Sequence, residues 1–451
     1  MDQVSISRSV RVAAGAFAPG HLGELTRVVP FEMVDDVLES TGRVQARVRV
    51  LPARVVVYLL LAAALFADVG YGQVWDKLCA GVGDAGATRP CASALRQARV
   101  RLGAGPLRAL FALVSGPAPT LARGACTYRG LLTCAIDGTI LYAPDSAANL
   151  VRFPKHRSVR GETGYPQVRL LALVACGTRS VIGAVFGTDK VGETVYAEGL
   201  LGRLHAGMLL LADRNFASRK LIEKIAETRA DLLIRVKAGR KLPSIGRLAD
   251  GTHLARVGAV TLRVIEAQIC VRTRTGCATG HYRLVTTLTD PRQYPAFSLV
   301  RLYHERWEVE TCYAELKDTM LGGRVLRAGT PEGVEQELYA LLTVYQLLRT
   351  VMTDATDSVP DTDPDRASFT VALQAARDQL ILAHAVIADE QVDLVGTIGR
   401  RVLQRLQPAR RQRIKQRIVK RALSKYNARG PAIDRATYKS TFSITVLVSP
   451  D

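Results

Sequence analysis

One short segment, residues 303–317, carries side chains whose types and spacing suit phosphate and metal chemistry. In a regular helix each residue advances by about 100°. Arg306, Glu310 and Lys317 then fall together with Tyr303 within an arc of roughly 60°. A phenol, a guanidinium, a carboxylate and an ammonium would share one side of the helix. A carboxylate placed between cations suits a site that handles metal ions and phosphate.

The rest of this segment divides into an apolar stripe and residues that we expect to be solvated. Its apolar side chains cluster beside the arc, as a helix face packed on a core should, and they are Val309, Tyr313, Leu316 and Met320. Glu308 and Glu315 lie on the opposite side and are predicted to be ordinary solvated charges. Two roles stay open for Trp307, at about 40° on the same scale: a wedge between bases, or ordinary packing.

Two aspartates share a second feature, because each follows an apolar run with the pattern of a buried strand. The run 131–136 leads into Asp137, and the run 208–212 leads into Asp213. Residues at the carboxyl ends of buried strands face the crevice where α/β sheets place their sites. With Glu310 these carboxylates make three hard oxygen donors for two Mg²⁺ or Mn²⁺ ions. Such a pair of metals supports phosphodiester chemistry without a covalent protein nucleophile.

Each of these assignments has a simpler structural alternative. Asp137 stands before Gly138 and could begin a turn, and Asp145 is a nearby alternative ligand. Asp213 could cap the helix that follows it, and Glu310 could be a surface glutamate. The order strand aspartate, strand aspartate, helix glutamate, with Arg and Lys on the glutamate face, favours the metal-binding interpretation.

Apolar patterning predicts an α/β fold with helical regions at both ends. Helical spacing covers 31–113, and strand-like runs follow at 131–136, 168–175, 181–186, 208–212 and 232–237. With helices expected at 193–204 and 218–228, this order makes a mixed sheet of the ribonuclease H type, flanked by helices. Short strands between 238 and 295 indicate a β-rich insertion before the last catalytic helix, which carries Glu310. Further helices are expected at 334–353, 369–388 and 392–425.

These patterns divide the chain into four predicted regions. A helical N-terminal DNA-binding domain occupies 1–120, and a ribonuclease H-like catalytic domain combines 121–237 with 296–360. The β-rich insertion 238–295 interrupts that domain, and a basic helical region, 361–451, ends the chain. The arginines of the N-terminal region suit either a grip on DNA or an accessory helical bundle, and the sequence does not choose between them.

The charge of the chain is one-sided. The 451 residues have a formal net charge of +20, and 12 Lys or Arg without any acidic residue lie between positions 400 and 429. A polyanion is the natural partner, because Lys and Arg displace condensed counterions from phosphates. The alternative is a solvated basic helix face. Arg410, Arg411 and Lys415 are the candidate DNA contacts in this run.

The remaining composition argues against several classes. The eight cysteines are scattered without a paired motif or histidines at ligand spacing, so a structural zinc site is not expected. As small core thiols they fit a reducing cytoplasm. The longest apolar run, 55–67, is too short to span a bilayer and begins far from the N-terminus. We therefore expect a cytoplasmic, nucleoid-associated protein without a membrane contact.

The spacing Y-(2)-R-(3)-E-(6)-K, formed by Tyr303, Arg306, Glu310 and Lys317, resembles the signature of bacterial insertion-sequence transposases of family four, which are DDE enzymes. The sequence Asp-Gly-Thr at 137–139 and Ala-Asp-Arg-Asn-Phe at 212–216 resemble the contexts of that family's two aspartates. The β-rich insertion and the stretch 51–75 are also similar to the family. The resemblance covers roughly residues 15–445.

By this resemblance the chain would be a DNA transposase that moves an insertion sequence by cut-and-paste transposition. The two aspartates and the glutamate would be its catalytic triad and would bind two Mg²⁺ or Mn²⁺ ions. Tyr303, Arg306 and Lys317 would hold terminal phosphates and a flipped base. Hydrolysis at the element end, a DNA hairpin and strand transfer would follow at one site. Terminal inverted repeats and target DNA would be the partners of a homodimer.

Two other functions stay open. Another nuclease of the same fold, such as a junction resolvase, would share the carboxylates but needs neither the signature spacing nor the insertion. An inactive or domesticated transposase-derived DNA-binding protein would usually lack one carboxylate, whereas all three are present here.

Overall fold

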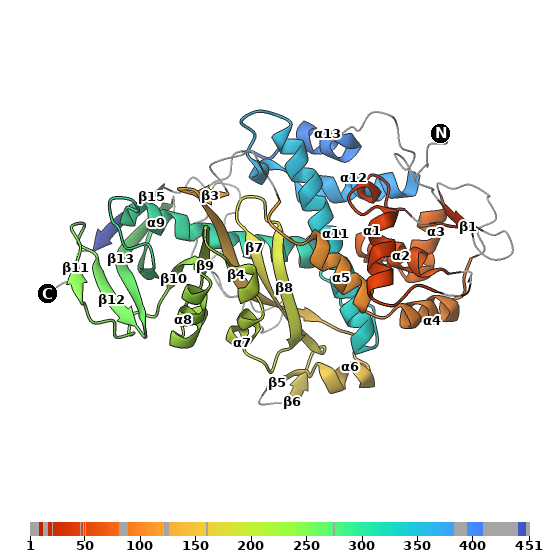
Figure 1. The fold of residues 1–451 in the computed structure, drawn as a ribbon, viewed down its shortest axis with the longest axis horizontal. Coiled ribbons are helices and arrows are strands. Elements are labelled where there is room, and N and C mark those ends of the chain that lie inside the picture. Colours follow the sequence, from red (N-terminus) through yellow and green to blue (C-terminus); the bar gives the residue numbers. More distant parts are fainter. Residues whose placement is uncertain are drawn as a thin grey trace. The chain divides into compact units, whose positions relative to one another are not determined.

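The fold is described from a computed structural model of the chain. The structure describes residues 9–11, 17–19, 21–45, 47, 49, 51–80, 89–118, 120, 126–158, 161–273, 276–382, 395–408 and 441–447. The chain divides into two compact units (Figure 1). The first unit is Met1–Arg203 with Glu308–Arg410, and the second is Leu204–Trp307 with Arg411–Asp451. No helix in the described part is long and apolar enough to cross a membrane.

The first unit begins with a small hairpin and then helices, as the apolar spacing of 31–113 predicts. The hairpin consists of β1 (Ser9–Arg11) and β2 (Phe17–Pro19), and the short 3-10 helix η2 (Leu25–Arg27) follows it. The helices are α1 (Phe31–Ser40), α2 (Ala53–Leu65), α3 (Tyr71–Ala80), α4 (Ala92–Leu102) and α5 (Gly105–Val114). Every residue of α2 except Arg54 is buried. A helix that is apolar on all sides has to lie inside a bundle, and α2 packs against its neighbours on several sides.

The long helix α11 (Pro331–Asp357) is the centre of the first unit. The hydroxyl of Thr330 caps it by accepting a hydrogen bond from the N–H of Gly333 at 3.2 Å. It packs against α2, α5, α12 (Phe369–Leu382) and α13 (Gly396–Gln404). The short 3-10 helix η7 (Pro364–Arg366) lies between α11 and α12 in sequence. The predicted helix 392–425 is seen as α13, which ends at Gln404, and residues 409–440 lie outside the described part.

The strands of the first unit form antiparallel pairs in the order β3 (Thr127–Tyr128), β4 (Leu131–Tyr142), β7 (Gln167–Ala175) and β8 (Val181–Thr188). Six consecutive residues at the end of β7 are buried, as expected for a strand covered on both faces. A tight turn joins β7 to β8, with φ values of +86° at Gly177 and +55° at Arg179. The helix α7 (Glu193–Glu198) lies against β4 and β7, and the short 3-10 helix η3 (Leu201–Arg203) follows it.

Smaller elements connect β4 to β7. They are α6 (Ala147–Arg152) and the hairpin of β5 (His156–Ser158) with β6 (Gly161–Thr163). The hydroxyl of Ser146 caps α6 by accepting a hydrogen bond from the N–H of Asn149 at 3.2 Å.

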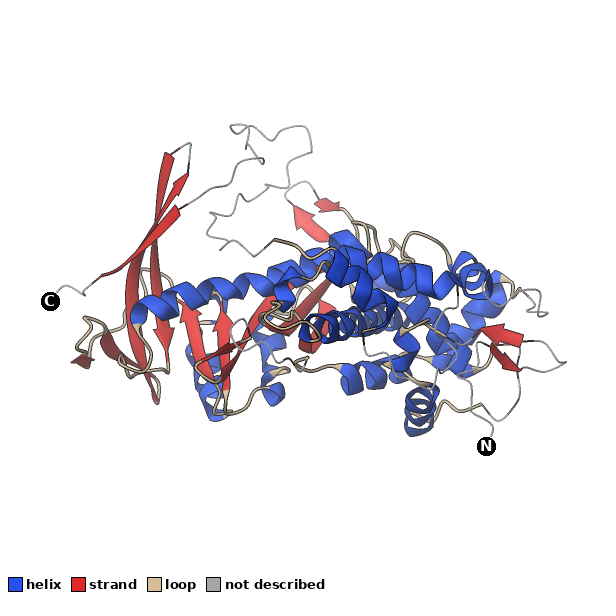
Figure 2. Cartoon of the chain, turned by 90° about the horizontal axis from the view of Figure 1, so that it is seen from above, coloured by secondary structure: helices blue, strands red, loops and turns tan. Residues whose placement is uncertain are grey.

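The second unit is a sheet with helices. Its strands lie in the order β11 (Gly246–Arg247), β12 (His253–Val257), β13 (Val260–Thr273), β14 (Gly276–Thr286), β10 (Asp231–Arg235) and β9 (Met208–Ala212). The pair β9–β10 is parallel, which the crossover helix α8 (Arg219–Glu227) makes possible. The strands β13 and β14 form a long hairpin (Figure 2). The helix α9 (Ala296–Leu302) packs on β13.

The last described strand, β15 (Thr441–Leu447), pairs with β13 from Glu266 to Arg272. The helical prediction for 361–451 therefore fails at its end. The sequence Thr-Phe-Ser-Ile-Thr-Val-Leu alternates polar and apolar residues and is rich in β-branched side chains, which favours a strand. The fold as a whole is α/β, with helices beside mixed strands and a β-rich insertion before the segment that carries Glu310, as predicted.

Candidate active site

The segment that carries Glu310 is not one regular α-helix. Tyr303–Arg306 form a 3-10 turn (η5), α10 covers Trp307–Ala314, and Glu315–Met320 form a π-helical stretch (η6). These conformations differ in residues per turn, so a uniform 100° step does not apply across the segment. The boundary between the two units falls directly after Trp307. Each residue is therefore placed within its own unit.

In the first unit, Asp137 lies in the middle of β4 and not at its end. The antiparallel ladder with β7 runs on as far as Tyr142, so the strand continues past the carboxylate. The prediction that Asp137 terminates a strand is wrong, and so is the alternative that it begins a turn with Gly138. Its half-buried carboxylate accepts a hydrogen bond from the N–H of Gly138 to Oδ1 at 2.9 Å.

The two faces of β4 have different neighbours, because alternate side chains of a strand point in opposite directions. On the face of Gly138, a Cβ would lie 2.5 Å from Oε1 of Glu193, which belongs to α7. Asp137 and Thr139 share the other face. There the ammonium of Lys317 donates to Oγ1 of Thr139 at 3.3 Å. The first aspartate and the signature lysine thus act on the same face of one strand.

Lys317 is half-buried in the π-helical stretch. Burial lowers the pKa of its ammonium, and the nearby carboxylate of Asp318 opposes this shift. A cation that has lost part of its hydration interacts more strongly with an anionic ligand such as a phosphate.

A buried hydroxyl connects α10 to the strand pair at Asp137. Tyr313 donates to the carbonyl oxygen of Asp137 at 2.5 Å and accepts the N–H of Ala172, on β7, at 2.9 Å. Burial raises the pKa of Tyr313 well above its usual value, and the carboxylate of Asp137 adds to the rise. The phenol therefore stays protonated and can donate. Glu310 stands three residues before it, on a neighbouring position of the helix.

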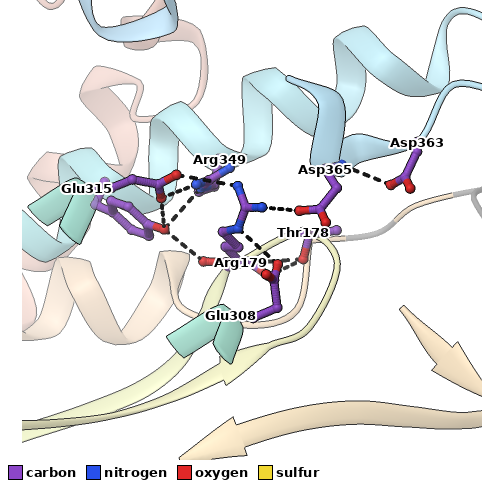
Figure 3. A network of polar contacts seen from close by, with 9 residues as sticks. Thr178, Arg179, Glu308, Glu315, Arg349, Asp363 and Asp365 are labelled. Atoms are coloured by element: carbon purple, nitrogen blue, oxygen red, sulfur yellow. Dashed lines mark hydrogen bonds and ion pairs between the residues drawn. The ribbon is translucent and has the colours of Figure 1, made fainter. Parts of the chain in front are cut away.

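Glu308 and Glu315 are buried, so the prediction that they are solvated charges is wrong. Arg179 donates from Nε to Oε2 of Glu308 at 2.9 Å and from Nη1 to Oε1 of Glu315 at 3.4 Å (Figure 3). It also pairs with Asp365, and Arg349 pairs with Glu315. Helical spacing alone could not show that arginines far away in sequence pair with Glu308 and Glu315. We call these five side chains the Arg179 network.

In the second unit, Asp213 directly follows β9, as predicted. Its Oδ1 accepts the N–H of Arg214 at 2.7 Å and so caps the short 3-10 helix η4 (Arg214–Phe216). The helix expected at 218–228 is capped by Ser218 and not by Asp213, and the Asp213 side chain remains partly exposed. Because β9 and β10 are parallel, their carboxyl ends lie at one edge, with Ile234 opposite Ala212.

Tyr303 and Arg306 lie near this edge. The hydroxyl of Tyr303 donates to the carbonyl of Ala212 at 3.3 Å. Burial raises the pKa of Tyr303, the guanidinium of Arg306 lowers it, and the carboxylate of Asp213 raises it further. The side chains of Tyr303 and Arg306 are buried, with 4% and 8% of their surface exposed.

An aromatic and cationic neighbourhood around Tyr303 was missed from the sequence. The ring centroid of Tyr282 lies 6.3 Å from that of Tyr303, and Cζ of Arg235 lies 4.2 Å from the Tyr282 centroid. His304 packs 5.8 Å from Tyr282, and burial lowers its pKa to about 4, with Arg306 and Arg235 adding to the shift. Arg235 could have been found, because it ends the strand parallel to β9. Nothing in the sequence distinguishes Tyr282 from other strand tyrosines.

The remaining candidate residues are the tryptophan next to the signature, the alternative ligand Asp145 and the basic run. Trp307 is partly exposed, and Cζ of Arg306 lies 5.4 Å from its ring centroid, within cation–π range. Asp145 pairs with Lys155 at the surface. Arg410, Arg411 and Lys415 lie outside the described residues.

Two N-terminal arginines have partners within the helical region. Nε of Arg54 donates to Oδ1 of Asp35 at 2.7 Å, and Cζ of Arg99 lies 3.9 Å from the ring centroid of Tyr71. Both side chains therefore contribute to helix packing, which favours the accessory bundle at these two positions.

Most of the cysteines for which the structure describes a side chain are free thiols, and Cys126, Cys134, Cys176 and Cys312 are buried as small core residues. Cys270, on β13, forms a disulfide, which the expectation of free core thiols did not include.

The predicted metal ligands are distributed over both units. Asp137 and Glu310 belong to the first unit and Asp213 to the second. Among the described residues, no group of three or more His, Cys, Asp or Glu side chains stands close enough to hold a metal ion. The donor chemistry itself fits Mg²⁺ or Mn²⁺, because all three are partly exposed carboxylates. The triad remains a prediction.

Comparison with known proteins gives consistent matches. Residues 19–112 match the insertion element 4 transposase N-terminal family, and residues 129–347 match the transposase DDE domain. Transposase InsG for insertion sequence element IS4 of Escherichia coli (strain K12) is 28% identical over 411 residues, which cover 88% of this chain and 91% of InsG. Putative transposase InsZ of the same organism is 28% identical over 200 residues, 43% of this chain and 64% of InsZ.

A solved structure is also similar to the chain. It is the cryo-EM structure of a piggyBac transposase synaptic complex with hairpin DNA, with a TM-score of 0.40 and 12% identity over 83% of this chain and 84% of that one.

The α/β fold and the matched catalytic region define a DDE transposase, a DNA-cleaving enzyme of the ribonuclease H-like class. The chain belongs to the insertion element 4 family of these transposases, because the N-terminal model of that family matches it and a transposase DDE domain follows in order. The resemblance inferred from the signature spacing is confirmed.

Proposed function

We propose that this transposase moves an insertion sequence by cut-and-paste transposition, with Asp137, Asp213 and Glu310 as its metal-binding catalytic residues. The observation that carries the proposal is the shared face of β4, where Asp137 lies two residues from the hydroxyl that Lys317 contacts. A phosphodiester there would meet the carboxylate of Asp137 and the ammonium of Lys317 on the same side of β4. Both residues fall within the region that matches the DDE domain.

The carboxylates suit hard divalent cations, and Mg²⁺ or Mn²⁺ is the proposed cofactor, as two ions. When bound, such a pair supplies Lewis acidity to the attacking and the leaving oxygen of a phosphodiester. Asp137 and Glu310 would bind through side chains held by β4 and α10, and Asp213 through a carboxylate that also caps η4.

The cationic and aromatic residues would hold the DNA end. Lys317 and Arg306 are the proposed phosphate contacts, and the ring of Tyr303 is the proposed platform for a flipped base. Trp307 is a further candidate contact. The basic run that contains Arg410, Arg411 and Lys415 would bind the DNA backbone without regard to sequence.

The proposed reaction follows the family resemblance. Water cleaves a phosphodiester at the element end and leaves a 3′-hydroxyl. That hydroxyl attacks the opposite strand, closes a hairpin on the element end and releases the flanking DNA. A second hydrolysis opens the hairpin, and the 3′-hydroxyl then attacks the target DNA.

The proposed partners are the terminal inverted repeats and the target DNA. Joining two element ends implies a homodimer in the DNA complex, acting at the nucleoid in the cytoplasm. We also propose the division of the chain into a DNA-binding domain 1–120, a catalytic domain 121–237 with 296–360, an insertion 238–295 and a basic region 361–451.

Cleavage of a supercoiled donor plasmid that carries the element's own ends tests the proposal. With Mg²⁺, Asp137→Asn, Asp213→Asn and Glu310→Gln should each lower nicking by about 100-fold or more, the scale of a single electrostatic catalytic group. DNA binding in a gel-shift assay should persist, because the substitutions remove negative charge. The control is Asp145→Asn, which removes a surface carboxylate paired with Lys155 and should nick normally. Retained nicking in any one triad variant would show that this residue is misassigned.

A further inference from the structure

Tyr313 occupies an unusual place in the strand ladder of the first unit. Asp137 and Ala172 stand opposite each other in the antiparallel register of β4 and β7. In a hydrogen-bonded pair such residues exchange N–H···O=C bonds directly. Here the phenol hydroxyl of Tyr313 bridges the two strands. It accepts the N–H of Ala172 at 2.9 Å and donates to the carbonyl of Asp137 at 2.5 Å.

Both partners of this hydroxyl are backbone groups of strands, so they cannot turn away as side chains can. Only 5% of the surface of Tyr313 is exposed, and the bridge is therefore protected from competing water. The two hydrogen bonds, from the Ala172 N–H and to the Asp137 carbonyl oxygen, therefore fix the position of the Tyr313 ring relative to the backbone of Asp137. The same ring extends from α10, three residues after Glu310.

The Arg179 network also contacts α10, through side chains other than Tyr313. Glu308 and Glu315, on either side of Glu310 in sequence, are paired with Arg179. These pairs connect α10 and η6 to the turn between β7 and β8, not to β4. The Tyr313 bridge, in contrast, joins α10 directly to the backbone of Asp137 on β4.

We propose that Tyr313 is a positioning residue, whose hydroxyl sets the spacing of Asp137 and Glu310 so that both carboxylates can bind one divalent cation. The proposal rests on the proposed function, because it takes these two residues as metal ligands. A hydroxyl that only stabilised the fold would leave metal affinity unchanged when removed from a protein that still folds.

Binding of Mn²⁺ to the full chain without DNA, measured by electron paramagnetic resonance or calorimetry, tests this role without relying on activity. Tyr313→Phe keeps the ring and removes only the hydroxyl. It should weaken Mn²⁺ binding by about 10-fold or more, as loss of a group that orients a ligand does. Asp137→Asn should abolish the strong site.

Tyr58→Phe is the matched control. Tyr58 is fully buried, and its hydroxyl donates to the carbonyl of Val29 at 2.9 Å, so its loss also leaves a buried carbonyl without that donor. It lies in α2 within the same unit, and Tyr58→Phe should bind Mn²⁺ as the unchanged chain does. If Tyr313→Phe folds poorly, p-aminophenylalanine at position 313 restores a donor to the Asp137 carbonyl and should bind Mn²⁺ within about threefold of the unchanged chain, a difference below 1 kcal/mol.

The outcomes separate the two proposals. If Asp137→Asn binds Mn²⁺ no differently from the unchanged chain, the metal assignment fails and this proposal fails with it. If Asp137→Asn loses the site while Tyr313→Phe keeps it, the metal assignment stands and the positioning role of Tyr313 is overturned. Equal weakening in Tyr313→Phe and Tyr58→Phe would also overturn it, because the effect would then be a general loss of stability.

Discussion

Nε of Arg179 lies 2.9 Å from Oε2 of Glu308, a residue with no exposed surface that stands two positions before Glu310. Arg179 reaches it from a turn in which its own φ is +55°, a left-handed conformation that costs energy for a residue with a side chain. Asp365 pairs with the same Arg179, and Arg349 pairs with Glu315, so the network gains one further charge of each sign. The helix that carries Glu310 is therefore held in place by buried charged side chains.

Glu308→Gln should destabilise the first unit, because the guanidinium of Arg179 would keep its burial and lose one of its carboxylates. Breaking a buried ion pair from one side costs roughly 3 kcal/mol. Urea-induced unfolding, followed by circular dichroism, measures the change in free energy of unfolding. The matched surface pair is Arg401 with Asp378, 2.6 Å apart and about half exposed. Arg401→Ala should cost less than about 1 kcal/mol, and an equal cost for both variants would contradict the importance of the network.

Gly138→Ala should displace Glu193, because the new Cβ would lie 2.5 Å from Oε1 and 2.9 Å from Cδ of that side chain. Moving the carboxylate also breaks its ion pair with Arg169, now 3.0 Å long. We expect a loss of roughly 1 kcal/mol in unfolding free energy, at the low end of overpacking costs because the end of a glutamate can move.

The double variant Gly138→Ala with Glu193→Ala checks this cause. It should be less destabilised than the sum of the two single variants, since they share the clash. Gly70→Ala is the control, because a Cβ there meets no atom within 4 Å. Simple additivity of the two changes would rule out the clash as the explanation.

His304 should make the stability of the second unit depend on pH. Burial lowers its pKa from an ordinary 6.5 to about 4, and Nε2 has no hydrogen-bond partner among the described residues. The unfolded chain takes up a proton near pH 6.5, whereas the folded chain resists protonation until about pH 4. Stability is therefore present above the unfolded pKa and falls as the pH drops through this window, by about 3 kcal/mol in total.

Denaturation of the unchanged chain and of His304→Phe at pH 7 and pH 5 isolates this contribution. The unfolding free energy of His304→Phe, relative to that of the unchanged chain, should be higher at pH 5 than at pH 7, because phenylalanine takes up no proton. His205→Gln, which replaces an exposed histidine of the same unit, is the control variant. A pH-independent difference between the unchanged chain and His304→Phe would contradict the assignment.

Lys317→Met should weaken binding of the element end in a salt-dependent way. The ammonium is partly desolvated, and a phosphate contact there would release about one counterion, so the slope of log K against log salt should decrease by about 0.9. Fluorescence anisotropy with end DNA at several salt concentrations measures the slope. Lys190→Met, at an exposed position of the same unit, is the control. An unchanged slope in Lys317→Met would exclude a phosphate contact by this lysine.

Much of the architecture follows from apolar patterning, which predicted the helices of 31–113, the buried run before Asp213 and the crossover helix after it. The same rule misplaced the end of β4, because Gly138 resembles a turn residue locally. Only the ladder with β7 shows that the strand continues. Local pattern cannot carry that information.

The candidate site could be predicted where the spacing of residues within one segment was enough. It could not be predicted where the environment of a residue depends on partners far away in sequence. The signature of Tyr303, Arg306, Glu310 and Lys317 identified the family, although the segment mixes three helical conformations. The solvated role assigned to Glu308 failed because Arg179 lies more than a hundred residues away in sequence.

The pairing of β15 with β13 means that the hairpin of the insertion gains a neighbouring strand from a segment far downstream in sequence. A nascent or truncated chain presents an open row of amide and carbonyl groups along β13 until that segment arrives. Such a row is a template for association with other extended chains, so removal of β15 should favour aggregation through β13.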